Sequence, residues 1–183
     1  MGIDEKAASV KLHELQTDRL RLNALHESDA DSFFTLKSDP NVTLPYFAQP
    51  FTRESSDRKL SALIAESEIG TSLCWAIRMR DTDAFIGSIV LWNLEPEKAQ
   101  AEVGYELIPT FHGKGFAGEA LDAVLTEAFS TLGFTTLVAL PGENNLASRR
   151  LLERHGFIEG GALEEDKHHL IIYSCQRPGL TEE

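Results

Sequence analysis

The segment His112-Gly113-Lys114-Gly115-Phe116-Ala117-Gly118 has the composition of a turn that binds phosphate. Glycine has no side chain, so the backbone of this turn can approach a ligand closely. A helix predicted over about 115–132 begins inside the turn, and the N–H groups of a helix's first turn lack intrahelical partners. The helix dipole adds partial positive charge at the same place. The sequence therefore predicts a seat for a phosphate-bearing ligand.

Carboxylates and imidazoles near this turn are candidates for proton transfer. Glu102 lies on a strand predicted over 99–108, and Glu106 falls on the same face because side chains alternate along a strand. Partial burial raises the pKa of a carboxyl group and suits it to general-base work. A carboxylate that orients a neighbouring strand is the other role open to Glu102. His168 and His169, in the last predicted strand, are further candidates, for which surface or packing roles are favoured.

Asn145 and Ser148 are spaced three apart at the start of a predicted helix. An N-cap asparagine followed by a first-turn serine explains both residue types. By itself, this spacing predicts a helix start and no chemistry.

The elements that position these residues follow from periodicity and turn signals. Strands are predicted over 19–25, 73–79, 85–92, 99–108, 135–140, 157–158 and 167–175, and helices over about 28–40, 52–70, 115–132 and 144–155. The stretch from Pro40 to Pro50 is predicted to be a loop. The middle strands form an antiparallel meander, and the strand over 135–140 is predicted to be buried and parallel. The fold class is α/β: a mixed sheet with helices on its faces.

Length and composition bound the class of protein. The chain has 183 residues, which fits one domain. We expect a loosely ordered segment over 1–16, a single domain over 17–176 and a tail over 177–183. The net charge of −12 argues against nucleic-acid or anionic-lipid partners. No membrane span or secretion signal is expected, and Cys74 and Cys175 are predicted to be reduced, structural residues of a cytoplasmic protein.

The glycine-rich turn resembles two nucleotide-binding motifs, the dinucleotide fingerprint and the Walker motif. Gly113-Lys-Gly115-Phe-Ala-Gly118 matches G-x-G-x-x-G, and Glu143 lies where a ribose-binding acid could sit. A dinucleotide fold, however, needs two βαβαβ halves, and only about 40 residues follow Glu143. A Walker motif fails because Lys114 is followed by glycine rather than serine or threonine.

Four blocks, in this order and spacing, resemble the GCN5-related N-acetyltransferase (GNAT) superfamily. They are 17–22 (TDRLRL), 101–107 (AEVGYEL), 112–120 (HGKGFAGEA) and 145–157 (NLASRRLLERHGF). The chain looks most like the ribosomal-protein N-terminal acetyltransferases of the RimJ/RimL type. The superfamily's cofactor loop, Gln/Arg-x-x-Gly-x-Gly/Ala, is matched with a departure at His112. The resemblance implies a central, mostly antiparallel twisted sheet of about seven strands with helices on both faces.

The resemblance also implies acetyl-CoA as cofactor, with CoA as product. The cofactor would lie against the fourth predicted strand and meet the turn that follows it, at Leu107, Ile108, His112, Gly113, Lys114, Gly115, Phe116 and Ala117. Lys114 could add a charge contact or be a solvated lysine. Asn145 matches a residue that contacts the pantetheine or phosphate arm. Ser148 matches one near the sulfur, where its hydroxyl could protonate the departing thiolate. Leu152 stands nearest to the tyrosine that serves as the acid in some other N-terminal acetyltransferases, so that device is absent.

The implied reaction is direct attack of a primary amine on the thioester, with Glu102 and Ser148 as the catalytic candidates. A backbone N–H of the fourth strand would stabilise the oxyanion. The acceptor could be a protein N-terminus, such as that of a ribosomal protein, or a small amine or amino acid. Tyr46, Phe47, Trp75 and Trp92 could shape its pocket, although core packing is the default for each. A coenzyme A-binding module without turnover and a nucleotide-dependent oxidoreductase are the alternatives, and the protein is expected to be a monomer or homodimer.

Overall fold

The middle strands carry apolar side chains on both faces, and this decides the layering of the molecule. The computed structural model describes residues 10–46, 48–165 and 168–179. Strand β3 (Leu73–Met79) is buried almost throughout. Because side chains alternate along it, Trp75 and Ile77 join one core cluster while Cys74 and Ala76 join another. A sheet with two apolar faces has to be covered on both.

Eight strands form a single sheet in the order β1-β2-β3-β4-β5-β6-β8-β7. Their bounds are β1 Leu15–Gln16, β2 Leu20–Ala24, β3 Leu73–Met79, β4 Phe85–Glu95, β5 Gln100–Leu107, β6 Thr136–Ala139, β7 Ile158–Glu165 and β8 His168–Gln176. Neighbouring strands are antiparallel except for β5 and β6, which run parallel. The predicted mixed, mostly antiparallel sheet is confirmed, with one strand more than the seven expected.

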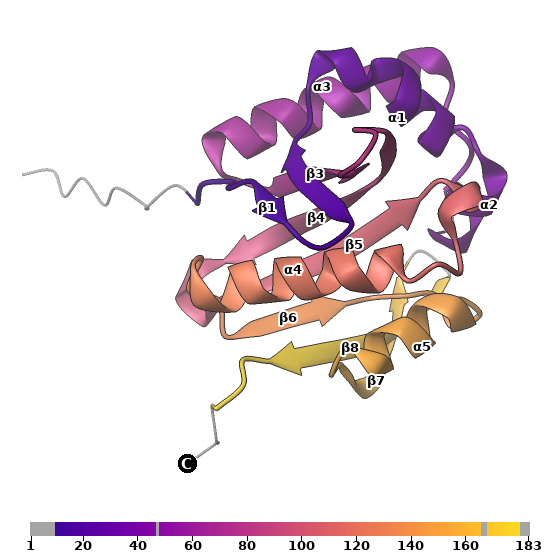
Figure 1. Ribbon diagram of the computed structural model, residues 1–183. Helices are drawn as coiled ribbons and strands as arrows, with labels where there is room; N and C mark the ends of the chain where they lie inside the picture. The colour runs from indigo at the N-terminus through magenta and orange to yellow at the C-terminus, as the bar shows by residue number, and fades with distance from the viewer. Residues whose placement is uncertain (1–9, 47, 166–167, 180–183) are drawn as a thin grey trace, which may run out of the picture.

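Helices cover both faces of this sheet (Figure 1). The α-helices are α1 Ala30–Lys37, α2 Pro40–Thr43, α3 Arg53–Ile69, α4 Phe116–Ser130 and α5 Leu146–Arg154, and the 3-10 turns are η1 Glu27–Asp29, η2 Leu44–Tyr46, η3 Pro96–Lys98 and η4 Pro109–Phe111. α4 and α5 pack on the face that contains Trp75, whereas α1 and α3 pack on the face that contains Cys74. The two helix layers therefore cover opposite faces of the sheet that contains β5.

Two stretches differ from the sequence expectations. The predicted loop after Pro40 opens instead with α2, because Asp39 caps the helix by accepting from the N–H of Asn41 at 2.8 Å, and proline is well suited to a first helical turn. Residues 10–16 are packed rather than loose. Leu12 and Leu15 contact the main core, and the indole N–H of Trp75 donates to the carbonyl of His13 at 2.8 Å. Strand β2 pairs with β1 on one side and so does not lie at the edge of the sheet.

Three further expectations concern membrane-spanning helices, the two cysteines and the class of cofactor. Across residues 10–179 as described, no helix has both the length and the apolar character that a bilayer crossing requires. Cys74 and Cys175 are both buried and form no disulfide. The sheet offers one parallel pair, where a dinucleotide fold would need a succession of them. The glycine-rich turn therefore lacks the surroundings of a dinucleotide site.

Candidate active site

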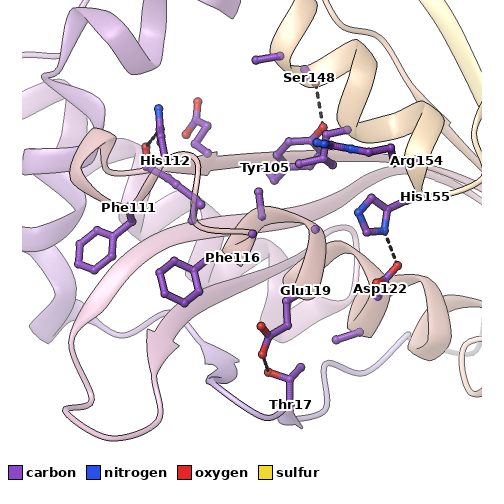
Figure 2. A pocket seen from close by; sticks show the side chains of 18 of the residues that line it. Thr17, Tyr105, Phe111, His112, Phe116, Glu119, Asp122, Ser148, Arg154 and His155 are labelled. Carbon is purple, nitrogen blue, oxygen red and sulfur yellow. Dashed lines mark hydrogen bonds and ion pairs between the residues drawn. The ribbon is translucent and has the colours of Figure 1, made fainter.

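A cleft opens where β5 and β6 separate. The two strands pair only at Gln100, Ala101 and Glu102, after which β5 continues alone to Leu107. The first turns of α4 and α5, each of which follows one of these strands, line the resulting space of about 1550 Å³ (Figure 2). The divergence of two parallel strands thus brings two helix N-termini to a single cleft.

The glycine-rich turn faces this cleft with a row of unused backbone donors. The first backbone hydrogen bond of α4 runs from the N–H of Glu119 to the carbonyl of Gly115 at 3.1 Å. Within the described part of the chain, the N–H groups of residues 113–118 have no hydrogen-bond acceptor. Unpaired amides at the positive end of a helix are a favourable seat for an anion such as a diphosphate. This geometry fits the phosphate ligand predicted from the sequence.

The shape of the turn depends on two left-handed residues. Gly113 has φ of 71° and Gly115 has φ of 81°, a region in which a Cβ atom is strained. His112, just before them, holds the turn against β5, because its Nε2 lies 2.8 Å from the carbonyl oxygen of Leu107. A carbonyl only accepts, so this nitrogen carries the proton. His112 therefore has a structural task that a glutamine or arginine side chain can also perform.

The block over 17–22 braces the block over 112–120. Glu119, in the first turn of α4, accepts from the hydroxyl of Thr17 at 2.5 Å and from Nε of Arg19 at 2.7 Å. The Arg19 guanidinium also donates to the carbonyl of Lys114 at 3.0 Å and lies 4.5 Å from the ring centroid of Phe116. Partial burial raises the pKa of Glu119, but the hydrogen bonds from Thr17 and Arg19 outweigh burial and hold that pKa below its usual value.

A second polar pair lies across the cleft from the turn. The hydroxyl of Tyr105 on β5 is 2.9 Å from the hydroxyl of Ser148 on α5, and Figure 2 shows the two side chains meeting over the gap. Asn145 is the N-cap of α5, and its side-chain oxygen accepts from the N–H of Ser148 at 3.2 Å. Burial raises the pKa of Tyr105 to about 12 despite the opposing hydrogen bond from Ser148. Tyr105 is therefore a protonated donor at neutral pH.

The free edge of β5 supplies a further donor. The N–H of Ile108 points to β4, where it donates to the carbonyl of Ile86 at 2.8 Å. Successive N–H groups of a strand point to opposite edges, so that of Leu107 points away from β4, toward the cleft. The Leu107 carbonyl, on the same edge, accepts from His112. The cleft side of β5 therefore carries a backbone N–H at Leu107 that β4 does not use.

The structure does not bring every predicted site residue into the cleft. Ile108 packs with the second core cluster, on the opposite face of the sheet. Lys114 turns back so that its ammonium donates to the carbonyl of Thr110 at 2.8 Å. Glu102 accepts from the side-chain amide of Asn93 at 2.8 Å and lies outside the residues that line the cleft. A hydrogen bond to the neighbouring strand β4 is compatible with the orienting role that the sequence left open for Glu102.

A second cavity, of about 580 Å³, lies on the other face of the sheet, beneath α3. Tyr105 and Glu106 line both this cavity and the cleft, one on each face of β5. The Glu106 carboxylate is paired with the ammonium of Lys37 at the end of α1. Two ligands that approach from opposite faces of the sheet would therefore meet at these two residues of β5.

The remaining candidates divide between packing and surface. Trp75 is fully buried, and its indole N–H is used within the core. Trp92 lines the second cavity, where its ring covers Gly104 so closely that a Cβ at that position would come within 2.6 Å of it. His169 pairs with Glu164 at the surface, at 3.3 Å. Phe47 and the side chain of Tyr46 lie outside what the structure describes. Neither His168 nor His169 lines either cavity as described.

Three groups at the site were not singled out from the sequence: the Tyr105 hydroxyl, the Arg19–Glu119 brace and Lys37. Tyr105 and Arg19 stand inside blocks that were recognised as conspicuous, so their positions gave a signal but their contacts did not. Lys37 gave no signal, because it is an ordinary basic residue in the last turn of a helix.

Comparison with known proteins agrees with this geometry. Residues 19–158 match the family model described as "Acetyltransferase (GNAT) domain". The N-acetyltransferase YoaA of Bacillus subtilis (strain 168) is 34% identical over 173 residues, which is 90% of this chain and 97% of YoaA. RimL, a ribosomal L7/L12 α-N-protein acetyltransferase, superimposes with a TM-score of 0.80 at 21% identity, over 90% of this chain and 94% of RimL. A spermidine N-acetyltransferase from Vibrio cholerae, solved with CoA and spermine, gives a TM-score of 0.78 at 20% identity, over 87% and 96% of the two chains.

Proposed function

Since the chain belongs to the acetyltransferase (GNAT) family of acetyl-CoA-dependent N-acetyltransferases, we propose that it transfers acetyl directly from acetyl-CoA to a primary amine held on the opposite face of β5. The observation that carries the proposal is the row of unpaired N–H groups over 113–118, across the cleft from the Tyr105–Ser148 pair. A protein N-terminus and a small amine are both acceptors that this reaction can use.

The residues of the cleft fit the two ends of such a cofactor. The N–H groups of the turn would hold the diphosphate, which carries negative charge and many acceptor oxygens. Leu107, Asn145 and Ser148, which all line the cleft, would flank the arm that bears the acetyl group. Acetyl-CoA supplies the activated thioester, and the protein supplies the orientation.

The proposed step balances without any further reactant. The amine nitrogen attacks the thioester carbonyl carbon, the C–N bond forms, the C–S bond breaks and its electron pair goes to sulfur. The Leu107 N–H would stabilise negative charge on the carbonyl oxygen. Ser148, whose hydroxyl is 2.9 Å from that of Tyr105, would give the sulfur a proton, and one proton would leave the amine.

The proton of the amine needs an acceptor, and two carboxylates on one face of β5 compete for this task. Glu102 is committed to Asn93 and lies outside both cavities. Glu106 lines both of them. The position of Glu106 favours it, although Glu102 was the first candidate from the sequence.

Thermal unfolding with acetyl-CoA, CoA, NAD and ATP tests the cofactor, and a thiol-release assay over a panel of amines tests turnover. Ligand at about 100 times its Kd should stabilise the fold by roughly 2.7 kcal/mol. We expect acetyl-CoA and CoA to raise Tm, and thiol release to require an amine. A shift with NAD alone would contradict the proposal, and binding of acetyl-CoA without amine-dependent thiol release would reduce the protein to a coenzyme A-binding module.

A further inference from the structure

The second cavity carries information on the acceptor. It is bounded by the inward face of α3, by β3 and β4, and by Gly104 and Glu106 of β5. With a volume of about 580 Å³, it is of the size of a small-molecule site. Tyr105 and Glu106 line both this cavity and the cleft, so an amine bound beside Glu106 would lie next to residues that also border the cofactor cleft.

The charges that line the cavity balance, although the whole chain has a net charge of −12. Lys37 and Lys59 oppose Glu66 and Glu106. Both carboxylates already have partners, since Glu106 pairs with Lys37 and Glu66 accepts from the hydroxyl of Ser72 at 2.9 Å. A polyamine would bring several positive charges into a cavity that contains two lysines and has no surplus of negative charge. The cavity therefore disfavours a polycation.

The Lys37–Glu106 pair is held firmly and partly withdrawn from solvent. The two side chains are 14% and 15% exposed. The Lys37 ammonium also lies 5.7 Å from the ring centroids of both Phe33 and Phe51, an arrangement that stabilises a cation. Taking two charges out of water is costly and is weak support for stability. What the pair gives the cavity is a fixed positive group beside a fixed negative group.

We propose that this cavity binds a neutral α-amino acid as the acetyl acceptor, with its ammonium on Glu106 and its carboxylate on Lys37. The proposal rests on the acetyl-transfer function proposed above. In an α-amino acid the ammonium and the carboxylate are attached to the same carbon, so their opposite charges lie close together. The ion-paired side chains of Lys37 and Glu106 also hold opposite charges close together, and each could face the oppositely charged group of the ligand. Each contact is charge-assisted, the stronger class of hydrogen bond.

The rest of the lining suits an apolar side chain on that amino acid. Leu63 of α3, Val90 of β4 and the indole of Trp92 all line the cavity. Lys59, which has no ion-pair partner among the described residues, would reinforce the attraction for a carboxylate. In the reaction, Glu106 accepts one ammonium proton and the freed nitrogen attacks the thioester carbon. The C–S bond then breaks, the nitrogen loses its second proton to water, and Ser148 protonates the thiolate from the cleft side.

The test is a matched acceptor series with the full-length wild-type protein and acetyl-CoA. The series comprises leucine, leucinamide, isoamylamine, spermidine and a leucine-initiated dipeptide, with thiol release as the readout. We expect kcat/KM for leucine to exceed that for each other acceptor at least tenfold. A preference for spermidine or for the dipeptide would overturn the inference while leaving acetyl transfer intact. No thiol release with any amine would overturn the proposed function itself.

Variants locate the preference. In Lys37→Met, KM for leucine should rise at least tenfold while KM for leucinamide moves less than threefold, and Lys37→Arg should restore part of the difference. Glu106→Gln should lower kcat at least tenfold more than Glu102→Gln, the carboxylate on the same face of the same strand. Cofactor-induced stabilisation, measured alongside, shows that each variant is folded. Equal losses for leucine and leucinamide in Lys37→Met, or a larger loss in Glu102→Gln, would contradict the assignment.

Discussion

The cavities on the two faces of β5 are lined by different kinds of chemical group. On the α4 side, the cleft is built from consecutive backbone amides over 113–118, fixed by the left-handed conformations of Gly113 and Gly115. On the α3 side, the cavity is built from charged side chains that come from helices and strands far apart in the chain. A backbone site recognises what every acetyl-CoA shares, whereas a side-chain site can change with few substitutions. If the proposed assignment of cofactor and acceptor to the two faces is right, the specificity for each is set by a different part of the molecule.

The largest effect is expected at the border of the two regions. Ser148→Ala and Tyr105→Phe should each lower kcat by about a hundredfold, the lower end of what a positioned proton donor contributes. The Kd for acetyl-CoA should change little. The double variant should lose little more than either single one, because the two hydroxyls act as a unit. Steady-state kinetics with direct cofactor titration separates the two quantities, and full kcat in both single variants would remove the pair from the mechanism.

The backbone character of the cleft can be broken at Gly115. Gly115→Ala should destabilise the fold by about 1 to 2 kcal/mol, the cost of a left-handed alanine, and weaken acetyl-CoA binding by about tenfold or more. Gly133→Ala is the matched control, because Gly133 also has φ of 81° with open space around it but follows α4 at its far end. It should lose stability alone. Calorimetric titration and denaturant unfolding provide the two readouts, and similar affinities in both variants would refute the role of the turn.

The brace under the turn should show a dependence on pH. The folded-state pKa of Glu119 lies below its ordinary value of 4.5, so its stabilising contribution is present above about pH 4.5 and is lost as pH falls through the lower folded-state pKa. We expect the wild type to be more stable than Glu119→Gln by about 1.5 to 3 kcal/mol at pH 7, the range for hydrogen bonds to a charged group. Denaturant unfolding at several pH values measures this difference. A gap that stays constant down to pH 3 would contradict the assignment.

The smallest effect is expected from reshaping the cavity alone. Gly104→Ala would place a Cβ within 2.6 Å of the Trp92 ring, and the indole would have to move into the space available for the acceptor. KM for the acceptor should rise a few-fold, with the Kd for acetyl-CoA unchanged. If cofactor affinity fell in step with acceptor affinity, the independence of the two faces would be wrong.

Sequence reasoning recovered the fold better than it recovered the acceptor side. Alternation predicted the middle strands, and the apolar run over 135–140 predicted a buried parallel strand, which pairs with β5 in the structure. The burial of β3 on both faces was not predicted. Pro40 was interpreted as a stop, because its role as a helix start depends on the Asp39 cap. The segment 1–16 was predicted to be loosely ordered because it is polar, whereas within 10–16 the residues Val10, Leu12 and Leu15 pack against the main core.

At the site, contiguity decided what could be predicted. The turn over 112–118 is one continuous segment, so its residue types alone were enough to predict a phosphate-binding turn. Tyr105 and Ser148 were each within a recognised block, but their hydrogen bond joins residues 43 apart. Lys37 and Glu106 are 69 residues apart, and no local pattern announces a pair of that kind. Glu102 was preferred to Glu106 for its place in a motif, whereas the two cavities favour Glu106.

The brace from Thr17 and Arg19 to Glu119 has a thermodynamic corollary. Coupling between two sites is reciprocal. If the contacts from Thr17 and Arg19 strengthen cofactor binding, then cofactor binding must stabilise those contacts by the same free energy. Amide protons of β2 should then exchange with solvent more slowly once acetyl-CoA is bound, although that strand lies outside the diphosphate seat. Amide exchange at β2 would therefore report whether the cofactor site is occupied.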